Sequence, residues 1–586
     1  MGLTCHTQRT DEASFDPGTA HCMRLVHRRS ARLRRVLLVT GALILSNTGI
    51  SQLTAQEPDT VLASAPPVID TVLVVRATVY TEEEAAQSSF YRFMNRVHIV
   101  TKERVIRDYL QFQVGEPYDS AEVAESERHL REKDIFREIS IDSVRLEDGR
   151  LAVVVRTQDG WSLKPKVSIS IASTGDWTGQ FGLNQLNLLG GGNQLYVAYV
   201  KELDRDGLNA SVDFDRILGP NIDFAANYAG LSDGKNGNWV LGLPFRNTES
   251  SSRYEWDGLA ANQNVLRYRV QDVQDSQVLD TTTYRRNAFI NNINAGLATH
   301  HETADYLRLG ATVGVRQEAF YLSPEDQEMA DDSVYGTVGA WAEIRKVRYQ
   351  QLSGFNGFGT EDIDLSPLVR LTATLAPDAF GWQGTGVGLG VTASAGQTGL
   401  NRRGWVWASV EGNYQWGGVA QDSGRVIFNI AAGYKPAVRH STAIQLQVGR
   451  LWNQKPGDEF DLGFDSAPRG WAAHAFVGDR AWWTTIEHRY YAVDEFLGLL
   501  AVGFGAFFDY GGAWYGDQTS RSGGSVGAGL RLAPAVSPVA MTNRIDVAYK
   551  VGPHATGSRW VIALGSGFAF PRRTIPTISY RAEPPH

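Results

Sequence analysis

The sequence predicts a mainly β protein, in which a transmembrane β-barrel of about 16 strands follows a small α+β domain. Residues 163–570 predict the barrel, because segments of alternating polarity, separated by Gly, Asn and Asp, recur throughout this range. Residues 71–160 predict the smaller domain, because stretches with helical spacing of apolar residues stand between β-branched stretches. No segment after the N-terminal region approaches about 18 uninterrupted apolar residues, so the sequence offers no membrane-spanning helix there.

The composition agrees with a β-rich chain and excludes two classes of site. The 586 residues carry a formal net charge of -8 that is spread along the chain, which gives no basis for nucleic-acid binding. Glycine (60 residues) and aromatic residues (10%) are abundant, as in proteins with many short strands and turns. The two cysteines are Cys5 and Cys22, so no disulfide or thiolate metal site can form after them.

The N-terminal region has the layout of a secretory signal peptide over residues 1–55. A basic stretch at 24–35 precedes a ten-residue apolar run at 36–45, and we expect cleavage after Ala55. The region before the apolar run is long for such a signal, so Met23 is the expected initiator. Residues 56–70, rich in Pro, Ser and Ala, are expected to form a mobile leader.

The elements expected between residues 71 and 160 follow the order β-α-α-β-β. Residues 71–80 are β-branched and predict a strand, and an acidic and aromatic insertion follows, whose structure the pattern does not predict. Thr101 is the expected N-cap of a first helix, and a second runs to about Lys133. Residues 137–146 and 150–157 predict two strands.

Alternation in the long C-terminal region fits a soluble β-sandwich or a membrane barrel. Residues 306–315 show it clearly, because their odd-numbered side chains are apolar and most of the others are polar or glycine. The unbroken length and the aromatics near segment ends favour the barrel. About 25 residues per strand gives about 16 strands. We expect the long polar stretches at 201–220, 246–285, 322–335 and 350–366 to form extracellular loops.

Two clusters offer metal ligands, and both fit a solvated loop better. Glu325, Asp326, Glu328, Asp331 and Asp332 have the oxygen ligands that calcium prefers, but their spacing matches no metal-binding loop. The run His300-His301-Glu302 suggests no third ligand. The sequence contains no serine elbow and no convincing His-Ser-acid set. We therefore expect no metal, no cofactor and no enzymatic activity.

Two carboxylates near the C-terminus are predicted to face the barrel interior. Counting by two along residues 500–509 puts Asp509 inward among small residues, and the same count puts Glu487 of the preceding segment on that side. A buried carboxylate needs a partner. Arg469, in the loop before both strands, can engage two carboxylates at once through its planar guanidinium.

The two residues after Arg469 suit a tight turn that enters the barrel. Gly470 allows a backbone conformation that other residues adopt rarely. Trp471 supplies a large ring that can wedge against the barrel wall.

This constellation resembles the outer-membrane assembly and translocation superfamily, which includes BamA, TamA and the two-partner secretion translocators and is also called the bacterial surface antigen family. In that family an Arg-Gly-Phe or Arg-Gly-Tyr motif on the sixth extracellular loop folds into the lumen and meets acids of the next two strands. The resemblance implies a lumen lock made of Arg469, Gly470, Trp471, Glu487 and Asp509. The chain departs from the family at Trp471 and in a tail, 571–586, that continues beyond the expected last strand.

The smaller domain adds a second resemblance. Residues 98–119 and 126–141 hold the stretches HIVTKERVIRDYLQFQVGEPYD and SERHLREKDIFREISI, which are similar to a polypeptide-transport-associated (POTRA) domain. An unrelated small periplasmic domain is the alternative. The insertion before Val97 departs from the family.

Together the resemblances imply a protein of the bacterial outer membrane with a periplasmic N-terminal domain. It would assemble or translocate polypeptides, receiving unfolded clients on residues 71–160 by strand addition. Outer-membrane lipid and other assembly subunits are the further expected partners. The alternative is a passive channel or structural surface barrel, in which the buried charges only stabilise the lumen.

Overall fold

The computed structural model describes residues 66–566, apart from 172–174, 176, 218–220, 274–275, 323–333, 356–357, 359, 419–421, 454, 465–466, 497–499, 535–541 and 556. The predicted signal peptide, the acidic stretch at 325–332 and the tail at 571–586 lie outside these residues. Within the described part, no helix is both long and apolar enough to cross a membrane.

The N-terminal domain packs helices against one face of a three-stranded sheet. Its strands lie in the order β1-β3-β2, with β1 parallel and β2 antiparallel to β3. Asp119 caps the longest helix by accepting a hydrogen bond of 2.7 Å from the amide of Ala121. The elements are β1 (Ile69–Ala77), α2 (Glu82–Gln87), α3 (Ser89–Val97), α4 (Glu103–Arg107), α5 (Ser120–Glu132), β2 (Phe136–Arg145) and β3 (Leu151–Asp159).

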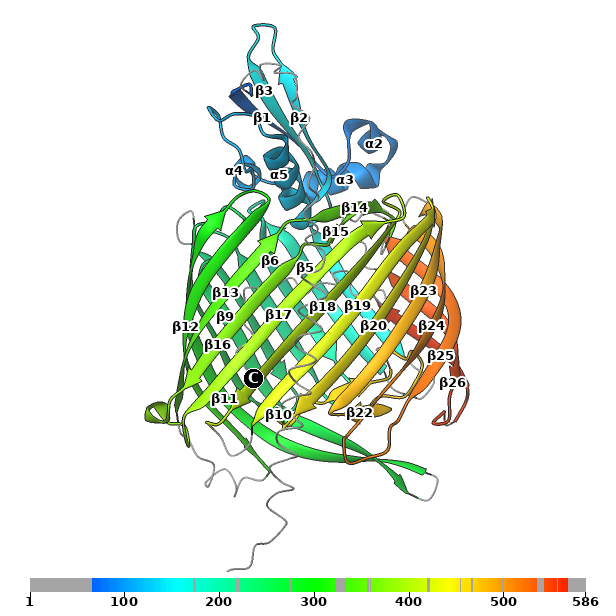
Figure 1. Cartoon of the computed structure of the whole chain (residues 1–586). Coiled ribbons are helices and arrows are strands. Elements are labelled where there is room, and N and C mark those ends of the chain that lie inside the picture. The colour runs from blue at the N-terminus through cyan, green and yellow to red at the C-terminus, as the bar shows by residue number, and fades with distance from the viewer. Residues whose placement is uncertain are drawn as a thin grey trace, which may run out of the picture. The chain divides into compact units, whose positions relative to one another are not determined.

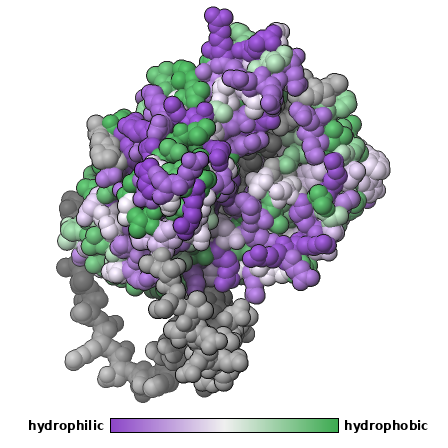
Figure 2. Space-filling model, turned by 90° about the horizontal axis from the view of Figure 1, so that it is seen from above, coloured by the Kyte–Doolittle hydropathy of each residue, from purple (hydrophilic) through white to green (hydrophobic). Residues whose placement is uncertain are grey.

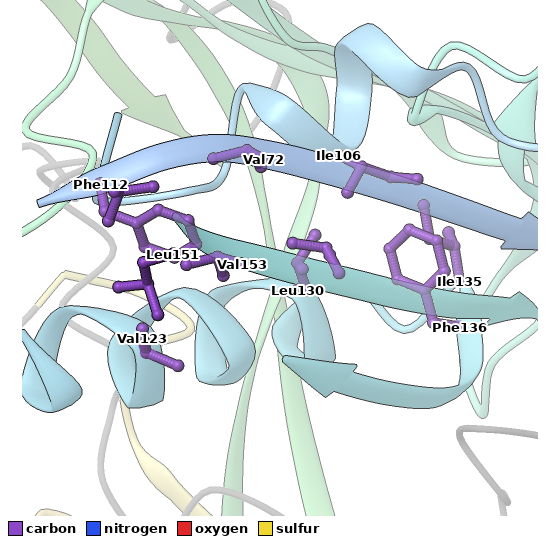
Figure 3. Packing of buried hydrophobic residues seen from close by; sticks show 11 residues of the cluster. Val72, Ile106, Phe112, Val123, Leu130, Ile135, Phe136, Leu151 and Val153 are labelled. Carbon is purple, nitrogen blue, oxygen red and sulfur yellow. The ribbon is translucent and has the colours of Figure 1, made fainter. Parts of the chain in front are cut away.

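The core of this domain lies between the sheet and α5. Figure 3 shows Leu130 of α5 and Val153 of β3 side by side, and both are fully buried. Ile106, the buried apolar residue of the short helix α4, joins the same cluster. Burial of these side chains is the main force that holds the helices on the sheet.

Two details of this domain differ from the sequence expectation. Thr101 does not cap a helix, because its hydroxyl donates to Asp159 and α4 begins at Glu103. The insertion after β1 forms the helical pair α2 and α3. Thr81 begins the pair with a reciprocal cap, in which Glu84 accepts from the amide of Thr81 at 2.7 Å.

The rest of the described chain forms a closed barrel of 20 antiparallel strands (Figure 1), so the prediction of about 16 strands is wrong. In chain order the strands are β4 (Leu163–Ile171), β5 (Trp177–Leu188), β6 (Asn193–Lys201), β7 (Asp206–Phe214), β8 (Asp223–Leu231), β9 (Gly234–Leu243), β10 (Ser252–Val273), β11 (Ser276–His301), β12 (Asp305–Tyr321), β13 (Tyr335–Lys346), β16 (Leu368–Ala376), β17 (Gly386–Gly399), β18 (Gly404–Trp416), β19 (Ser423–Ala437), β20 (His440–Trp452), β23 (Arg480–Phe496), β24 (Leu500–Trp514), β25 (Gly523–Pro534), β26 (Asn543–Val551) and β27 (Trp560–Ser566).

Some of the strands lie in polar stretches that were expected to be loops. Residues 201–220 contain β7, and residues 246–285 contain most of the hairpin formed by β10 and β11. Arg253 and Asp257 of β10 are buried, so polarity alone does not mark a loop.

The stretch at 350–366 is also corrected. It forms a small hairpin of β14 (Tyr349–Ser353) and β15 (Thr360–Asp364). Arg131 of α5 contacts Asp362 of this hairpin with an Nε–Oδ2 distance of 3.0 Å. The hairpin therefore lies at the end of the barrel beside the N-terminal domain, not at the opposite end as predicted (Figure 1).

The barrel turns its apolar side chains outward. In β12, Leu307, Leu309 and Val313 are 36%, 44% and 54% exposed, whereas Arg308 is 1% exposed. In β24, Ala501, Phe507 and Asp509 are buried and Phe504 and Phe508 are exposed, as the alternation predicts. An apolar exterior around a polar interior is the reverse of a soluble β-sandwich.

The last strand of the barrel pairs with the first. Among the described residues, β27 pairs with β4 through Leu564 and Ile171 alone, whereas β4 pairs with β5 along its whole length.

Candidate functional site

A loop between β20 and β23 carries Arg469 into the barrel. The loop contains a two-stranded sheet of β21 (Phe460–Leu462) and β22 (Phe476–Gly478). Gly470 has φ +80°, a conformation that side chains rarely adopt. A Cβ atom at Gly470 would lie 3.3 Å from Val561 of β27 and 3.5 Å from Ala548 of β26. The turn therefore rests against the last two strands, next to the seam.

Trp471 fixes the turn against the inner wall. Its indole is 4% exposed and packs on Phe476, with ring centroids 4.8 Å apart. The indole N–H donates to the carbonyl of Gly524 in β25 at 2.9 Å. A polar tip with a partner and a buried ring body make Trp471 an anchor for the loop.

Arg469 engages both carboxylates that strand parity points inward. Its Nε and Nη2 donate to the two oxygens of Asp509 at 2.6 and 2.9 Å, and its Nη1 donates to Glu487 at 2.8 Å. The Arg469 amide also donates to Asp509 at 3.1 Å. The guanidinium lies 3.5 Å above the ring of Phe507, and Arg469 is 1% exposed. This two-point contact uses the planar geometry that lysine lacks.

Three further charged residues complete the network. Asp546 of β26 lies 3.6 Å from the Arg469 Nη1 and accepts from Arg531 of β25 at 2.6 Å. Arg531 also contacts Glu487 at 3.2 Å, as does Arg489 at 2.9 Å. The network thus joins the loop to β23, β24, β25 and β26.

Sequence reasoning missed the roles of Asp546, Arg531 and Arg489. Their signal was present, because each is a charged residue on the inward face of an alternating strand. Their mutual distances depend on the register between β23, β24, β25 and β26, which alternation within one strand does not reveal.

A second segment enters the barrel from the end that carries the N-terminal domain. Phe355, between β14 and β15, is 1% exposed and packs on Trp405 with ring centroids 5.5 Å apart. The Phe355 carbonyl accepts hydrogen bonds from Ser441 (3.0 Å), Arg489 (3.0 Å) and Tyr491 (2.5 Å). Arg489 thus connects this hairpin to Glu487, and through Glu487 to Arg469.

The N-terminal domain contacts the same hairpin. Besides the ion pair of Arg131 with Asp362, the guanidinium of Arg128 lies 4.5 Å from the ring centroid of Tyr349. Both arginines lie on α5. A continuous set of contacts therefore runs from α5 through the hairpin to the lumen lock.

The opposite mouth of the barrel is crossed by the ends of β10 and β11. Tyr268 of β10 stacks on His474 of the Arg469 loop at 3.8 Å, and Arg269 pairs with Asp517 at 3.2 Å. Burial alone would lower the pKa of His474, but the carboxylates of Asp204 and Asp461 outweigh it and raise the pKa to about 9. His474 is therefore a cation at neutral pH. It pairs with Asp461 and stacks on Tyr268, which connects β10 to the Arg469 loop.

Within the described part of the chain, one group of side chains at the surface offers metal ligands. His300, Glu302 and Asp305 place ligand atoms within 4.8 Å of one another, and His300 Nε2 lies 2.6 Å from Asp305. Asp305 supplies the third ligand that the run at 300–302 lacks. The ion pair of His300 with Asp305 explains the cluster without a metal.

No protein-family model and no curated protein matches the chain. Among solved structures, it is similar to CdiB from Acinetobacter baumannii, with 10% identity, 86% of this chain and 74% of that chain covered, and a TM-score of 0.43. It is also similar to BamA from Haemophilus ducreyi lacking POTRA domains 1–3 (10% identity, 85% of each chain, TM-score 0.36) and to the alcaligin outer-membrane receptor FauA from Bordetella pertussis (11% identity, 71% and 77%, TM-score 0.30).

Proposed function

We propose that this protein is an outer-membrane member of the assembly and translocation superfamily that helps other polypeptides insert into or cross the membrane. The observation that carries the proposal is the Arg469 turn, which lies inside a closed barrel and binds Asp509 through two nitrogens and Glu487 through a third. The order Arg-Gly-aromatic, Glu, Asp along the chain is the pattern of that superfamily.

The position of the turn suggests what it controls. Gly470 approaches β26 and β27, and β27 pairs with β4 at the closure of the barrel. Each backbone hydrogen bond in such a closure contributes only about 0.5–1.5 kcal/mol net. An incoming strand that pairs with the edge of β4 or β27 would replace these bonds, and the lumen lock would keep the wall in shape while it does so.

The N-terminal domain would present clients to this wall. β2 is an edge strand of its sheet, so its free main-chain groups suit strand addition by an extended segment. With the domain in the periplasm, contacts from α5 to the hairpin of β14 and β15 would report client binding to the lumen. No nucleotide or metal enters this scheme, because folding of the client releases the free energy.

The alternative is a passive channel or structural barrel, which would use the same charges only for stability. Depletion of the protein separates the two, with wild-type and Arg469→Ala genes supplied for complementation. An assembly protein predicts that folded levels of other outer-membrane barrels, or of exported proteins in the medium, fall on depletion and recover only with the wild-type gene. Arg450→Ala, at an exposed arginine of β20, is the matched control and should complement fully. Unchanged barrels and exoproteins after depletion would leave only the passive role.

A further inference from the structure

Helix α3 presents an apolar face that nothing in the described chain covers. Phe90, Phe93 and Val97 are 53%, 59% and 50% exposed. Their spacing of three and four residues puts them on one side of the helix, with the half-buried Met94 beside them. Large exposed apolar side chains grouped in this way mark an interaction surface.

The opposite side of α3 is fixed to the N-terminal domain. The Asn95 side chain accepts from the amide of Tyr80 at 3.0 Å and donates to the carbonyl of Tyr80 at 2.8 Å. Tyr91 stacks on Tyr80 with ring centroids 4.1 Å apart. The helix therefore cannot turn its apolar face inward without breaking both contacts.

The end of α3 is tied to the barrel rim. Asp159 accepts from the amide of Thr101 at 2.8 Å and lies 2.8 Å from His98 Nε2. The side chain of Asn187 in β5 donates to the Thr101 hydroxyl at 2.8 Å, and the amide of Lys102 donates to the carbonyl of Gly190 at 2.9 Å. These bonds hold α3 beside the turn between β5 and β6 (Figure 1).

Apolar surface continues from this rim onto the outer wall. Leu189 at the turn is 64% exposed, and Leu183 of β5 and Leu163 of β4 are 54% and 39% exposed. Ile99, which is 52% exposed, lies between α3 and the turn. Seen from above, hydrophilic surface is mixed with apolar patches (Figure 2).

We propose that α3 is an interfacial helix that lies in the phospholipid headgroups of the leaflet around this end of the barrel. Phe90, Phe93 and Val97 would reach the boundary of the acyl chains. Arg92 and Arg96, both exposed on the adjacent face, would meet lipid phosphates. This inference rests on the proposed membrane location of the barrel. It gives α3 a role, which is to hold the N-terminal domain at a fixed height beside β4 and β5, the first strands after the seam.

The test measures the depth of α3 in a bilayer. The full chain, with Cys5→Ser and Cys22→Ser, receives a single cysteine at Phe93 that carries an environment-sensitive fluorophore. After reconstitution in phosphatidylethanolamine and phosphatidylglycerol, lipids brominated at different depths act as quenchers. We expect the label to be quenched most by shallow bromines, at a depth of about 5–10 Å below the headgroup surface. Phe90→Cys gives a second reading of the same face.

Labels at two further positions distinguish a wrong assignment of α3 as an interfacial helix from a wrong membrane location of the barrel. Val167→Cys, at an outward residue of β4 that is 59% exposed, should be quenched by deep bromines. Val144→Cys, at the end of β2 and 41% exposed, should not be quenched at all. Quenching at Val167 without quenching at Phe93 and Phe90 overturns the interfacial helix alone, whereas no quenching at Val167 overturns the membrane location. An apolar emission from the Phe93 label in detergent, unaffected by brominated lipid, would mean that another protein segment covers α3, and would also overturn the proposal.

Discussion

At the scale of single residues, Arg469 and Asp509 depend on each other more than Arg469 and Glu487 do. Glu487 keeps Arg489 at 2.9 Å and Arg531 at 3.2 Å when Arg469 is removed. The closest cation to Asp509 is Arg469, through two hydrogen bonds. Loss of the guanidinium therefore leaves the Asp509 charge buried without its main counter-charge.

We expect Arg469→Ala to destabilise the folded barrel by about 3–5 kcal/mol, the usual cost of breaking a buried ion pair. Arg469→Lys should fall between this variant and the wild type, because an ammonium cannot hold Asp509 at two points. The temperature at which heat-modifiable gel migration is lost measures the effect. Equal temperatures for Arg469→Ala and the Arg450→Ala control would show that the buried pair does not stabilise the barrel.

Removal of both partners should be milder than removal of one. The double variant with Arg469→Ala and Asp509→Ala leaves no unpaired charge at the centre of the site, so it should recover part of the stability lost in Arg469→Ala. The same melting measurement gives the coupling between the two residues. Additive losses in the double variant would argue that the two side chains act independently.

His474 makes the loop contact sensitive to pH. Its pKa is raised from the ordinary 6.5 to about 9 in the folded protein, so its contribution is complete below about pH 6.5 and is lost as pH rises through 9. We expect protease cleavage in the loop between β20 and β23 to increase from pH 7 to pH 10. His474→Gln should cleave at one rate throughout, and an equally steep rise in that variant would assign the pH dependence to another group.

Strand parity predicts which side chains of one strand face the lumen, but it does not predict which side chains of neighbouring strands meet. The alternation in β23 and β24 puts Glu487 and Asp509 on the inner face, and the structure buries both against Arg469. Asp546 and Arg531 could not be assigned the same way, because their contact depends on how β25 and β26 are offset. Register is a property of neighbouring strands and not of either strand alone.

At the scale of elements, the sequence did not predict the hairpin of β14 and β15. Its polar residues suggested a solvent-exposed loop, but Ile363 and Leu365 join Phe355 in a buried cluster with Trp405 and Trp407. Strands of five residues are too short to show alternation clearly. The sequence also left residues 81–95 without a structure, although Thr81 and Glu84 form a recognisable cap.

We expect Phe355→Ala to loosen the hairpin of β14 and β15 from the barrel interior. The substitution removes a buried ring that packs on Trp405, which costs about 3–5 kcal/mol in a well-packed core. The freed hairpin should raise single-channel conductance in planar bilayers and increase the frequency of open events. Gln351→Ala, at an exposed position of β14, is the control. Conductance equal to that of the wild type would mean that the hairpin does not obstruct the lumen.

At the scale of the whole molecule, the number of strands sets the width of the lumen. A barrel of 20 strands is wider than one of about 16, because diameter grows with strand number. The fold class followed from alternation and length, but the strand count did not, because it assumed about 25 residues per strand, whereas the strands from β4 to β10 follow one another at shorter intervals. A wider lumen also explains why two segments enter it, the Arg469 loop from one end and the Phe355 hairpin from the other.

Reconstitution in vesicles tests directly whether the barrel helps other polypeptides to insert into or cross the membrane. Vesicles with and without the purified protein receive a urea-unfolded outer-membrane barrel or exported protein on the side that carries the N-terminal domain. We expect the protein to speed the appearance of folded, protease-protected client, and Arg469→Ala to lose most of this gain while Arg450→Ala keeps it. If the client folds or is transported at the same rate in empty vesicles and in vesicles with the wild-type protein, the protein does not assemble or translocate this client.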